Sequence, residues 1–283
     1  MATNLTTRPL YSLIDKACKL GGLGYTNSVG QHFESEDHVK EFGPSTFGEL
    51  NAEDYDELHD PGTTDECVNL IAALAGSGTV LELAVGTGRI ALPLTERGLS
   101  VHGIEGSERM VSKLKAKPGG ESIPVVVGDF ADVAVDGTYD FVFLVFNTLF
   151  NLTSQRDQVR CFRNVAERLR DGGAFLVEAV IPDVGGFQDG YRVRTKHVDF
   201  GSAWLEAAKY DPVRQLIEFQ RIRITNEGVK LVPLPMRYAW PSEIDLMAQL
   251  AGLKLKYRWG GWDRTEFTSK SKMHISVYEK PVG

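Results

Sequence analysis

Three carboxylates in the first half of the chain stand in or at the end of short β-prone runs. Glu82 stands in TVLELAV, Glu105 ends SVHGIE and Asp129 ends PVVVGD. In an open α/β sheet, ligands bind at the carboxyl ends of the strands, and an acid after the second strand accepts from ribose hydroxyls. We therefore expect Glu105 to bind a ribose and Asp129 to accept from an adenine amino group. Phe130 and Met110 are expected to pack beside the adenine.

A glycine turn, Gly86-Thr87-Gly88, follows the first of these runs and precedes a helical segment. Glycine allows a sharp bend and a close approach of a ligand to the main chain. The run from Gly86 to Ala91 also fits the G-x-G-x-x-A dinucleotide pattern. Glu82, four residues before Gly86, would repel a pyrophosphate but attract an ammonium group. The turn favours a cationic adenosine ligand without phosphates, and a NAD(P)-dependent oxidoreductase is the alternative.

Candidate catalytic groups flank the same edge. Glu178 lies late in the apolar run AFLVEAVI, and an unpaired charge deeper in a sheet is costly, so we expect it to face the cleft. The alternative for Glu178 is a carboxylate that accepts from a backbone N–H or pairs with an arginine. Tyr55 and His59 precede the first core helix, where they either act at the site or are surface or helix-capping residues.

Two further residues are candidates for substrate binding. Asn151 lies just beyond the fourth strand-like run and could orient an acceptor. Trp204 either lines the substrate cavity or fills the core. The basic run YRVRTKH, residues 191–197, is either a solvated edge or a binder of an acidic substrate group.

The elements that must position these residues alternate between strand and helix. Helical periodicity marks 64–75, RIALPLTERG, SERMVSKLKAK and 155–170, and β-prone runs separate them. YDFVFLVFN is apolar without alternation, which is typical of a parallel strand buried on both faces. The order therefore predicts a doubly wound α/β fold.

The second half of the chain changes character. Between about 197 and 238 the sequence indicates strands joined by tight turns, with no helix between them. PSEIDLMAQLAGL is then a helix, and KLKYRWGGW and KMHISVYEK are two strands that complete the sheet. We expect an N-terminal lid at 1–50, a core formed by 51–183 and 238–283, and an antiparallel insert at 184–237 that covers the substrate site.

The composition excludes several classes of protein. A chain of 283 residues that is 42% hydrophobic can bury a large core, and its net charge of −7 disfavours a nucleic-acid partner. The three cysteines are too few for a disulfide framework, and no metal-ligand spacing occurs. No signal peptide or long apolar segment stands out. We expect a metal-independent cytoplasmic protein without a membrane partner, and a homodimer is left open.

ELAVGTG, HGIEGSERM, GDFADV and YDFVFLVFNTLFNL resemble, in this order, motifs I to IV of the class I S-adenosylmethionine-dependent methyltransferases. The resemblance covers about 64–181, and RYAWPSEIDLMAQLAGLKLKYRWGGWD resembles the closing helix and hairpin of that family. One departure is Ala84-Val85, where many members have a small or cysteine residue followed by glycine.

This resemblance implies a Rossmann-like fold with a mostly parallel seven-stranded sheet and S-adenosyl-L-methionine as cofactor, with S-adenosyl-L-homocysteine as product. It places the following residues around the cofactor: Glu82, Ala84, Gly86, Thr87, Gly88, Glu105, Gly106, Met110, Asp129, Phe130 and Phe146.

The layout of the insert looks like that of small-molecule N-methyltransferases such as the aminosugar dimethyltransferases of macrolide biosynthesis. The implied reaction moves a methyl group to nitrogen or oxygen of a small-molecule acceptor, such as a natural-product intermediate. An amine acceptor must be neutral, and an alcohol needs a general base. A non-catalytic S-adenosylmethionine-binding protein is a further alternative.

Overall fold

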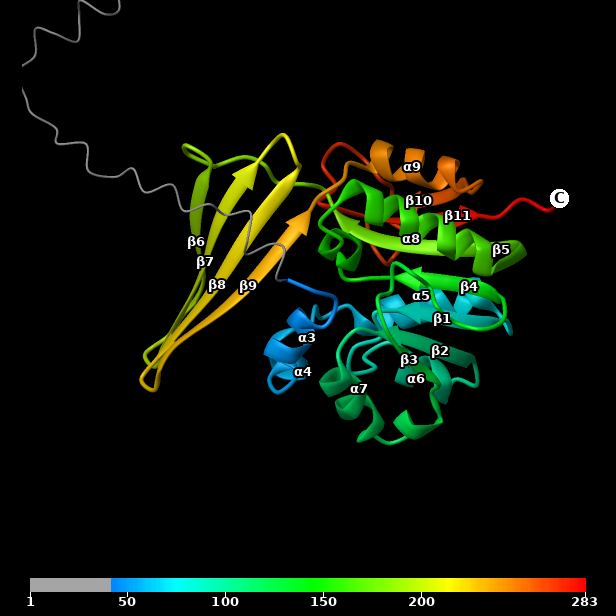
Figure 1. The fold of residues 1–283 in the computed structure, drawn as a ribbon, viewed down its shortest axis with the longest axis horizontal. Helices are drawn as coiled ribbons and strands as arrows, with labels where there is room; N and C mark the ends of the chain where they lie inside the picture. Colours follow the sequence, from blue (N-terminus) through cyan, green and yellow to red (C-terminus); the bar gives the residue numbers. More distant parts are fainter. Residues whose placement is uncertain (1–41) are drawn as a thin grey trace, which may run out of the picture. The chain divides into compact units, whose positions relative to one another are not determined.

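A seven-stranded sheet forms the centre of the molecule. The computed structural model describes residues 42–283, so most of the expected lid at 1–50 lies outside the described residues. The strand order is β10-β11-β5-β4-β1-β2-β3 (Figure 1). The strands are β1 (Thr79–Leu83), β2 (Ser100–Glu105), β3 (Val125–Val127), β4 (Tyr139–Leu144), β5 (Leu169–Val180), β10 (Lys254–Trp259) and β11 (Met273–Glu279).

The sheet is parallel from β3 to β5, and its last two strands are antiparallel. β1 pairs in parallel with β2 and β4, whereas β11 runs antiparallel to β5 and to β10. The predicted α/β fold with a mostly parallel sheet is therefore confirmed. The carboxyl ends of β1, β2, β4 and β5 meet at one edge, where the predicted acids stand.

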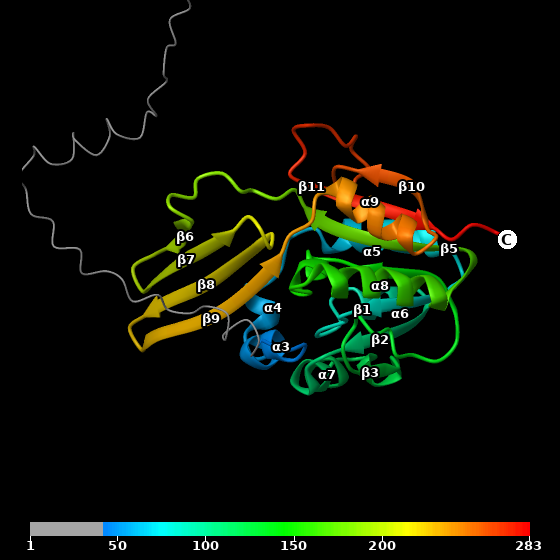
Figure 2. The ribbon, with the colours of Figure 1, turned by 45° about the horizontal axis from the view of Figure 1, so that its top comes forward.

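Helices cover both faces of this sheet, because side chains of successive strand residues point to opposite faces. Leu81, Val142 and Val177 face the side covered by α8 (Gln155–Arg168) and α9 (Pro241–Leu250). Val80, Phe143 and other residues face α5 (Thr64–Ala75), α6 (Ala91–Glu96) and α7 (Glu108–Lys115) on the other side (Figure 2). Within residues 42–283, no helix combines the length and the apolar character that crossing a bilayer requires.

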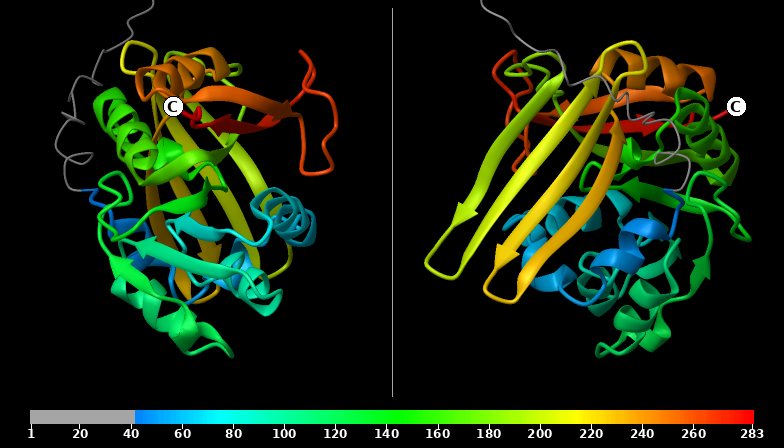
Figure 3. Two further views of the ribbon diagram at one scale, coloured as in Figure 1. Left: turned by 90° about the vertical axis from the view of Figure 1, so that its right-hand side faces the viewer. Right: turned by 60° about the vertical axis from the view of Figure 1, so that its left-hand side comes forward.

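Four strands form the insert as an antiparallel meander. They are β6 (Tyr191–Val198), β7 (Ser202–Asp211), β8 (Leu216–Thr225) and β9 (Gly228–Arg237). β6 is an edge strand and begins six residues before the position expected from the sequence. The insert strands run alongside the short helices α3 (Thr46–Asn51) and α4 (Tyr55–Leu58) (Figure 3).

Arg237 links the insert to the helices of the core. It is only 5% exposed, and its guanidinium donates to Oε1 of Glu243 at 2.7 Å and to Oε1 of Gln158 at 2.6 Å. Gln158 in turn donates from Nε2 to the carbonyl oxygen of Arg237 at 2.8 Å. These contacts tie the end of β9 to α8 and α9.

Candidate active site

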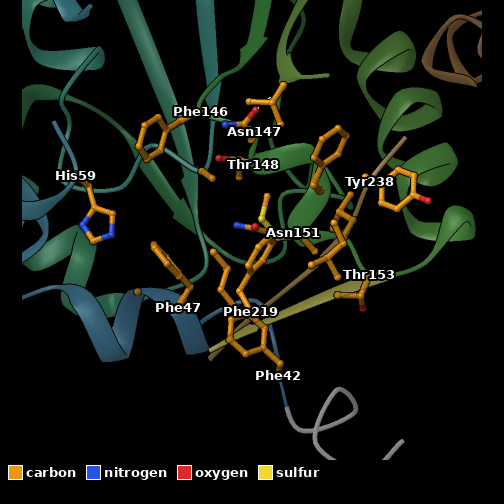
Figure 4. Close-up of a pocket in the computed structure, with 18 of the residues that line it drawn as sticks. Phe42, Phe47, His59, Phe146, Asn147, Thr148, Asn151, Thr153, Phe219 and Tyr238 are labelled. Atoms are coloured by element: carbon orange, nitrogen blue, oxygen red, sulfur yellow. Dashed lines mark hydrogen bonds between the residues drawn. The ribbon is translucent and has the colours of Figure 1, made fainter. Parts of the chain in front are cut away.

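A cavity of about 590 Å³ lies at the carboxyl ends of β1, β2, β4 and β5, and the insert forms its opposite wall. Aromatic side chains surround it, among them Phe47 of α3, Phe146 after β4 and Phe219 of β8, with Asn151 between them (Figure 4). A second cavity of about 560 Å³ adjoins it and shares His59, Phe146 and Arg221 with the first. Trp204 lines only the second cavity.

The turn after β1 exposes main chain to the first cavity. Ala84, Gly86 and Gly88 all have positive φ, at 55°, 57° and 84°. A Cβ on Gly86 would meet no atom within 4 Å, whereas one on Gly88 would lie 2.8 Å from Cδ1 of Leu114. Gly86 therefore faces open space, and Gly88 serves the packing of the turn on α7.

Two hydrogen bonds from backbone N–H groups fix the carboxylate of Glu105 beside the turn after β1. Its Oε2 accepts from the N–H of Gly86 at 2.8 Å, and its Oε1 accepts from the N–H of Ser107 at 3.0 Å. A carboxylate oxygen can accept more than one hydrogen bond, so each oxygen retains capacity for a ligand hydroxyl. The side chain is 7% exposed, and burial raises the pKa of Glu105 above 4.5.

Asp129 lies at the end of the cavity beyond β3. Its Oδ1 accepts from the N–H of Ala131 at 2.9 Å, and its Oδ2 pairs with Arg160 at 3.1 Å. A Cβ on the preceding Gly128 would meet no atom within 4 Å. Phe130 and Met110 line the cavity beside Asp129, as a flat aromatic ligand would require.

Residues of the expected lid that are described cover the loop after β2. The hydroxyl of Ser107 donates to Glu49 at 2.6 Å, and a Cβ on Gly106 would lie 2.4 Å from the carbonyl oxygen of Pro44. Phe42 and Phe47 line the cavity from this segment. These residues could not be predicted from the sequence, because the segment shows no periodicity that would orient them.

The chain after β4 is strained and is tied to β5. Phe146 and Asn147 both have positive φ, at 61° and 62°, a conformation that costs non-glycine residues energy and is common at functional sites. The N–H of Phe146 donates to Oε2 of Glu178 at 2.6 Å, and Oδ1 of Asn147 accepts from the N–H of Val180 at 2.5 Å. These bonds direct the Phe146 side chain into both cavities.

The expectation that Glu178 faces the cleft is wrong. Glu178 lines neither cavity, because β5 turns its side chain toward the face that carries α5. Its carboxylate accepts from Phe146 and from the indole of Trp262. The alternative, a carboxylate that accepts from a backbone N–H, describes the observed position.

Three of the predicted cofactor residues lie outside the lining of the first cavity: Glu82, Thr87 and Gly88. Glu82 is 3% exposed on the α5 face, and burial raises its pKa well above the ordinary value. Its Oε2 has no hydrogen-bond partner among the described residues. Thr87 is 1% exposed and donates to Oδ1 of Asp56 at 2.5 Å. The side chains of Glu82 and Thr87 therefore pack beneath the turn, on the side away from the cavity.

Tyr55 and His59 stack on one another at the boundary of the two cavities, with ring centroids 4.8 Å apart. Nε2 of His59 lies 3.1 Å from Nη1 of Arg221, and since a guanidinium only donates, Nε2 is the acceptor. Burial and the charge of Arg221 lower the pKa of His59 to about 4, and burial raises the pKa of Tyr55 to about 12. Both rings are uncharged at neutral pH.

Comparisons with known proteins agree with this geometry. Residues 80–173 match a family model described as a methyltransferase domain. The structure of the CcbJ methyltransferase from Streptomyces caelestis is similar with a TM-score of 0.80 and 38% identity, over 85% of this chain and 100% of that one.

Two further proteins are similar at lower identity. The cypemycin N-terminal methyltransferase of Streptomyces sp is 27% identical over 248 residues, which are 84% of this chain and 98% of that protein. CalS10, an amino pentose methyltransferase from Micromonospora echinaspora, shares the fold with a TM-score of 0.54 and 17% identity, over 90% of this chain and 99% of that one. The full-length match to CcbJ and the matched domain show that the chain belongs to the class I S-adenosylmethionine-dependent methyltransferases.

Proposed function

We propose that this methyltransferase transfers the methyl group of S-adenosylmethionine to a nitrogen atom of a small-molecule biosynthetic intermediate. The observation that carries the choice of nitrogen is the state of His59, whose Nε2 accepts from Arg221 and whose pKa is about 4. An alcohol acceptor needs a general base, whereas a neutral amine brings its own lone pair. The similar cypemycin enzyme is named for an N-terminal methylation, which supports the same choice.

The residues present fit S-adenosylmethionine. The open main chain at Gly86 and Gly128 leaves room for a ligand against the backbone, and Glu105 offers acceptors for two ribose hydroxyls. We assign Asp129, Phe130 and Met110 to the adenine. S-adenosylmethionine, when bound, supplies an electrophilic methyl group on a positively charged sulfur.

The chain's own contribution is to align the acceptor and to exclude water. Orientation of two reactants can supply about 7–11 kcal/mol of the barrier. Phe146 and His59 line both cavities, and Tyr55, stacked on His59, lines the first. We assign them to positioning of the acceptor beside the methyl group, together with Asn151 and, farther along the insert, Trp204.

Calorimetric titration and a product assay test the proposed function. We expect binding of S-adenosylmethionine and S-adenosylhomocysteine but not of NAD, and mass spectrometry should find methylated amines in a panel of matched amines and alcohols. Methylation of the alcohols in place of the amines would contradict the choice of nitrogen. Failure of either adenosyl ligand to bind would contradict the donor site itself.

Glu105→Ala should weaken binding of S-adenosylhomocysteine by about 1–3 kcal/mol, because charge-assisted hydrogen bonds to the ribose are lost. Asp140→Ala is a matched control, since Asp140 also accepts from a backbone N–H, that of Thr79 at 2.7 Å, but lines neither cavity. Both affinities are measured by calorimetry on folded variants. Equal losses in the two variants would show that Glu105 acts only on the fold.

The protonation state of Glu105 should also control how the affinity for S-adenosylhomocysteine depends on pH. Ribose hydroxyls donate to the ionised form, and burial raises the pKa of Glu105 above 4.5. Affinity for S-adenosylhomocysteine should therefore be complete above that raised pKa and should decline as the pH falls through it, at a pH above 4.5. A Glu105→Gln variant should have weaker affinity without this decline. A wild-type titration that is flat down to pH 4.5 would rule out this role.

A further inference from the structure

The insert presents more positive than negative charge to the cavities. Four cationic side chains of β6 and β8 line the first cavity: Arg192, Arg194, Lys196 and Arg221. Asp183 pairs with Arg192 at 3.5 Å and with Arg194 at 2.6 Å, and Glu206 pairs with Lys196 at 3.4 Å. Among the described residues, Arg221 has no carboxylate within ion-pair distance, and its one hydrogen bond goes to the neutral ring of His59.

Arg221 stands in the wall that the two cavities share. It is directly opposite Glu206 on β7 and Val232 on β9. Burial lowers the pKa of its guanidinium and the charge of Glu206 acts in the opposite direction, and an arginine remains charged at neutral pH. A guanidinium has five N–H donors in a planar fork, and His59 takes only one. The remaining donors are free to bind a planar anion.

Other unused donors lie on the same face of the insert. Nε1 of Trp204 and Nε of Arg223 are buried and have no hydrogen-bond partner in the part of the chain that the structure describes. Trp204 and Arg223 are opposite one another on β7 and β8, and both line the second cavity. Buried donors without acceptors are costly and uncommon in native proteins. A ligand that brings oxygen acceptors would satisfy them.

The first cavity also has an apolar part beside this cation. Phe219 precedes Arg221 by two residues on β8, and Leu234 and Met236 of β9 lie on the same wall. The wall is thus suited to a ligand with an apolar body and a negatively charged end. A carboxylate matches the single unpaired fork, whereas a phosphate dianion would be repelled more strongly by Glu206 across the strand.

We propose that Arg221 binds a carboxylate of the methyl acceptor, so that the substrates of this enzyme are amines that also carry a carboxylate group. This inference rests on the proposed function, because it names a substrate class for the same site. His59 is a positioning residue in this arrangement, since its Nε2 accepts from Nη1 of the guanidinium and holds Arg221 in the wall of the cavity.

A pair of isosteric probes tests the inference on the S-adenosylhomocysteine-loaded protein. We expect calorimetry to show that hydrocinnamate binds about tenfold or more tightly than hydrocinnamamide, because a charged bidentate pair replaces a neutral contact. Arg221→Met should abolish this preference, and Arg221→Lys, which retains the charge without the fork, should reduce it.

Arg214→Met is the matched control, because Arg214 belongs to the insert and pairs with Asp211 at 2.7 Å but lines neither cavity. It should keep the full preference for the carboxylate. Equal binding of the two probes, binding of neither, or a preference that survives in Arg221→Met would each overturn the inference.

Failure of the inference and failure of the proposed function give different results. A protein that binds S-adenosylhomocysteine and methylates amines, but does not prefer hydrocinnamate, overturns the carboxylate role alone. A protein that prefers hydrocinnamate, yet methylates no amine in the panel, overturns the proposed function.

Discussion

Gly86→Val is expected to lower affinity for S-adenosylhomocysteine by about a hundredfold or more, equivalent to about 2.7 kcal/mol, while the chain stays folded. The reason is that a side chain at Gly86 enters open space at the carboxyl end of β1, where no protein atom lies within 4 Å of its Cβ. That space is the surface against which we place the donor. Calorimetry measures the affinity, and circular dichroism verifies the fold.

Gly98→Val is the control for backbone strain. Gly98 has φ of +88° and equally open surroundings, but it precedes β2 at the other end of the sheet. Both substitutions place a β-branched residue in a left-handed conformation, which costs about 1–3 kcal/mol of stability. Only the variant at Gly86 should lose the donor, and Gly86→Ala should give an intermediate loss. Similar affinities for the Gly86 and Gly98 variants would refute a donor site at this turn.

Arg237→Leu should reduce the free energy of unfolding by about 3–5 kcal/mol, because it leaves a buried hydrogen-bonded ion pair without its cation. The carboxylate of Glu243 and the side-chain oxygen of Gln158 each lose a guanidinium donor at the junction of β9, α8 and α9. Urea denaturation followed by circular dichroism measures the loss. The double variant Arg237→Leu with Glu243→Leu should recover part of it, since no uncompensated charge then remains.

Arg170→Leu separates this effect from the general loss of an arginine. Arg170 pairs with Asp140 at 2.8 Å, but its side chain is 51% exposed. Exposed pairs contribute about 0–1 kcal/mol, so this variant should be nearly as stable as the wild type. If the two variants lose the same stability, the buried junction is not what holds the insert to the core.

The fold was largely predictable because its signals are local. Alternating strand and helix periods, Ser154 before α8 and the two glycines of the turn each act within a few residues of the chain. Ser154 accepts from the N–H of Asp157, as its position before a helix predicts. The acids Glu105 and Asp129 could be placed at the edge because a parallel sheet fixes where strand ends meet.

The positions of Glu178 and Glu82 could not be predicted, because they depend on the face of the sheet to which each side chain points. Glu178 and Glu82 both lie on the α5 face, near Arg89, and not in the cavity. A strand buried on both faces shows no alternation that would reveal this orientation. Glu105, which accepts from the N–H of Gly86, is the carboxylate of the two that lines the first cavity.

The wall that the insert contributes to the cavities could not be predicted, because the residues that meet there are distant in sequence. Arg221 meets His59 across 162 positions of the chain, and nothing in either local sequence indicates the other. The sequence of residues 191–197 alone is compatible with either a solvated edge or a binder of an acidic group. β6 is an edge strand, and three of its bases line the first cavity.

The two walls of the first cavity come from different sheets, and this has an evolutionary consequence. The residues that we assign to the methyl donor follow β1, β2 and β3, whereas the opposite wall of the cavity consists of alternate residues of the insert strands, such as Ile217, Phe219 and Arg221. Substitutions at those alternate positions would change the shape of the wall on the insert side without altering the residues that we assign to S-adenosylmethionine. Enzymes with this arrangement can evolve to accept new substrates while they keep the same methyl donor.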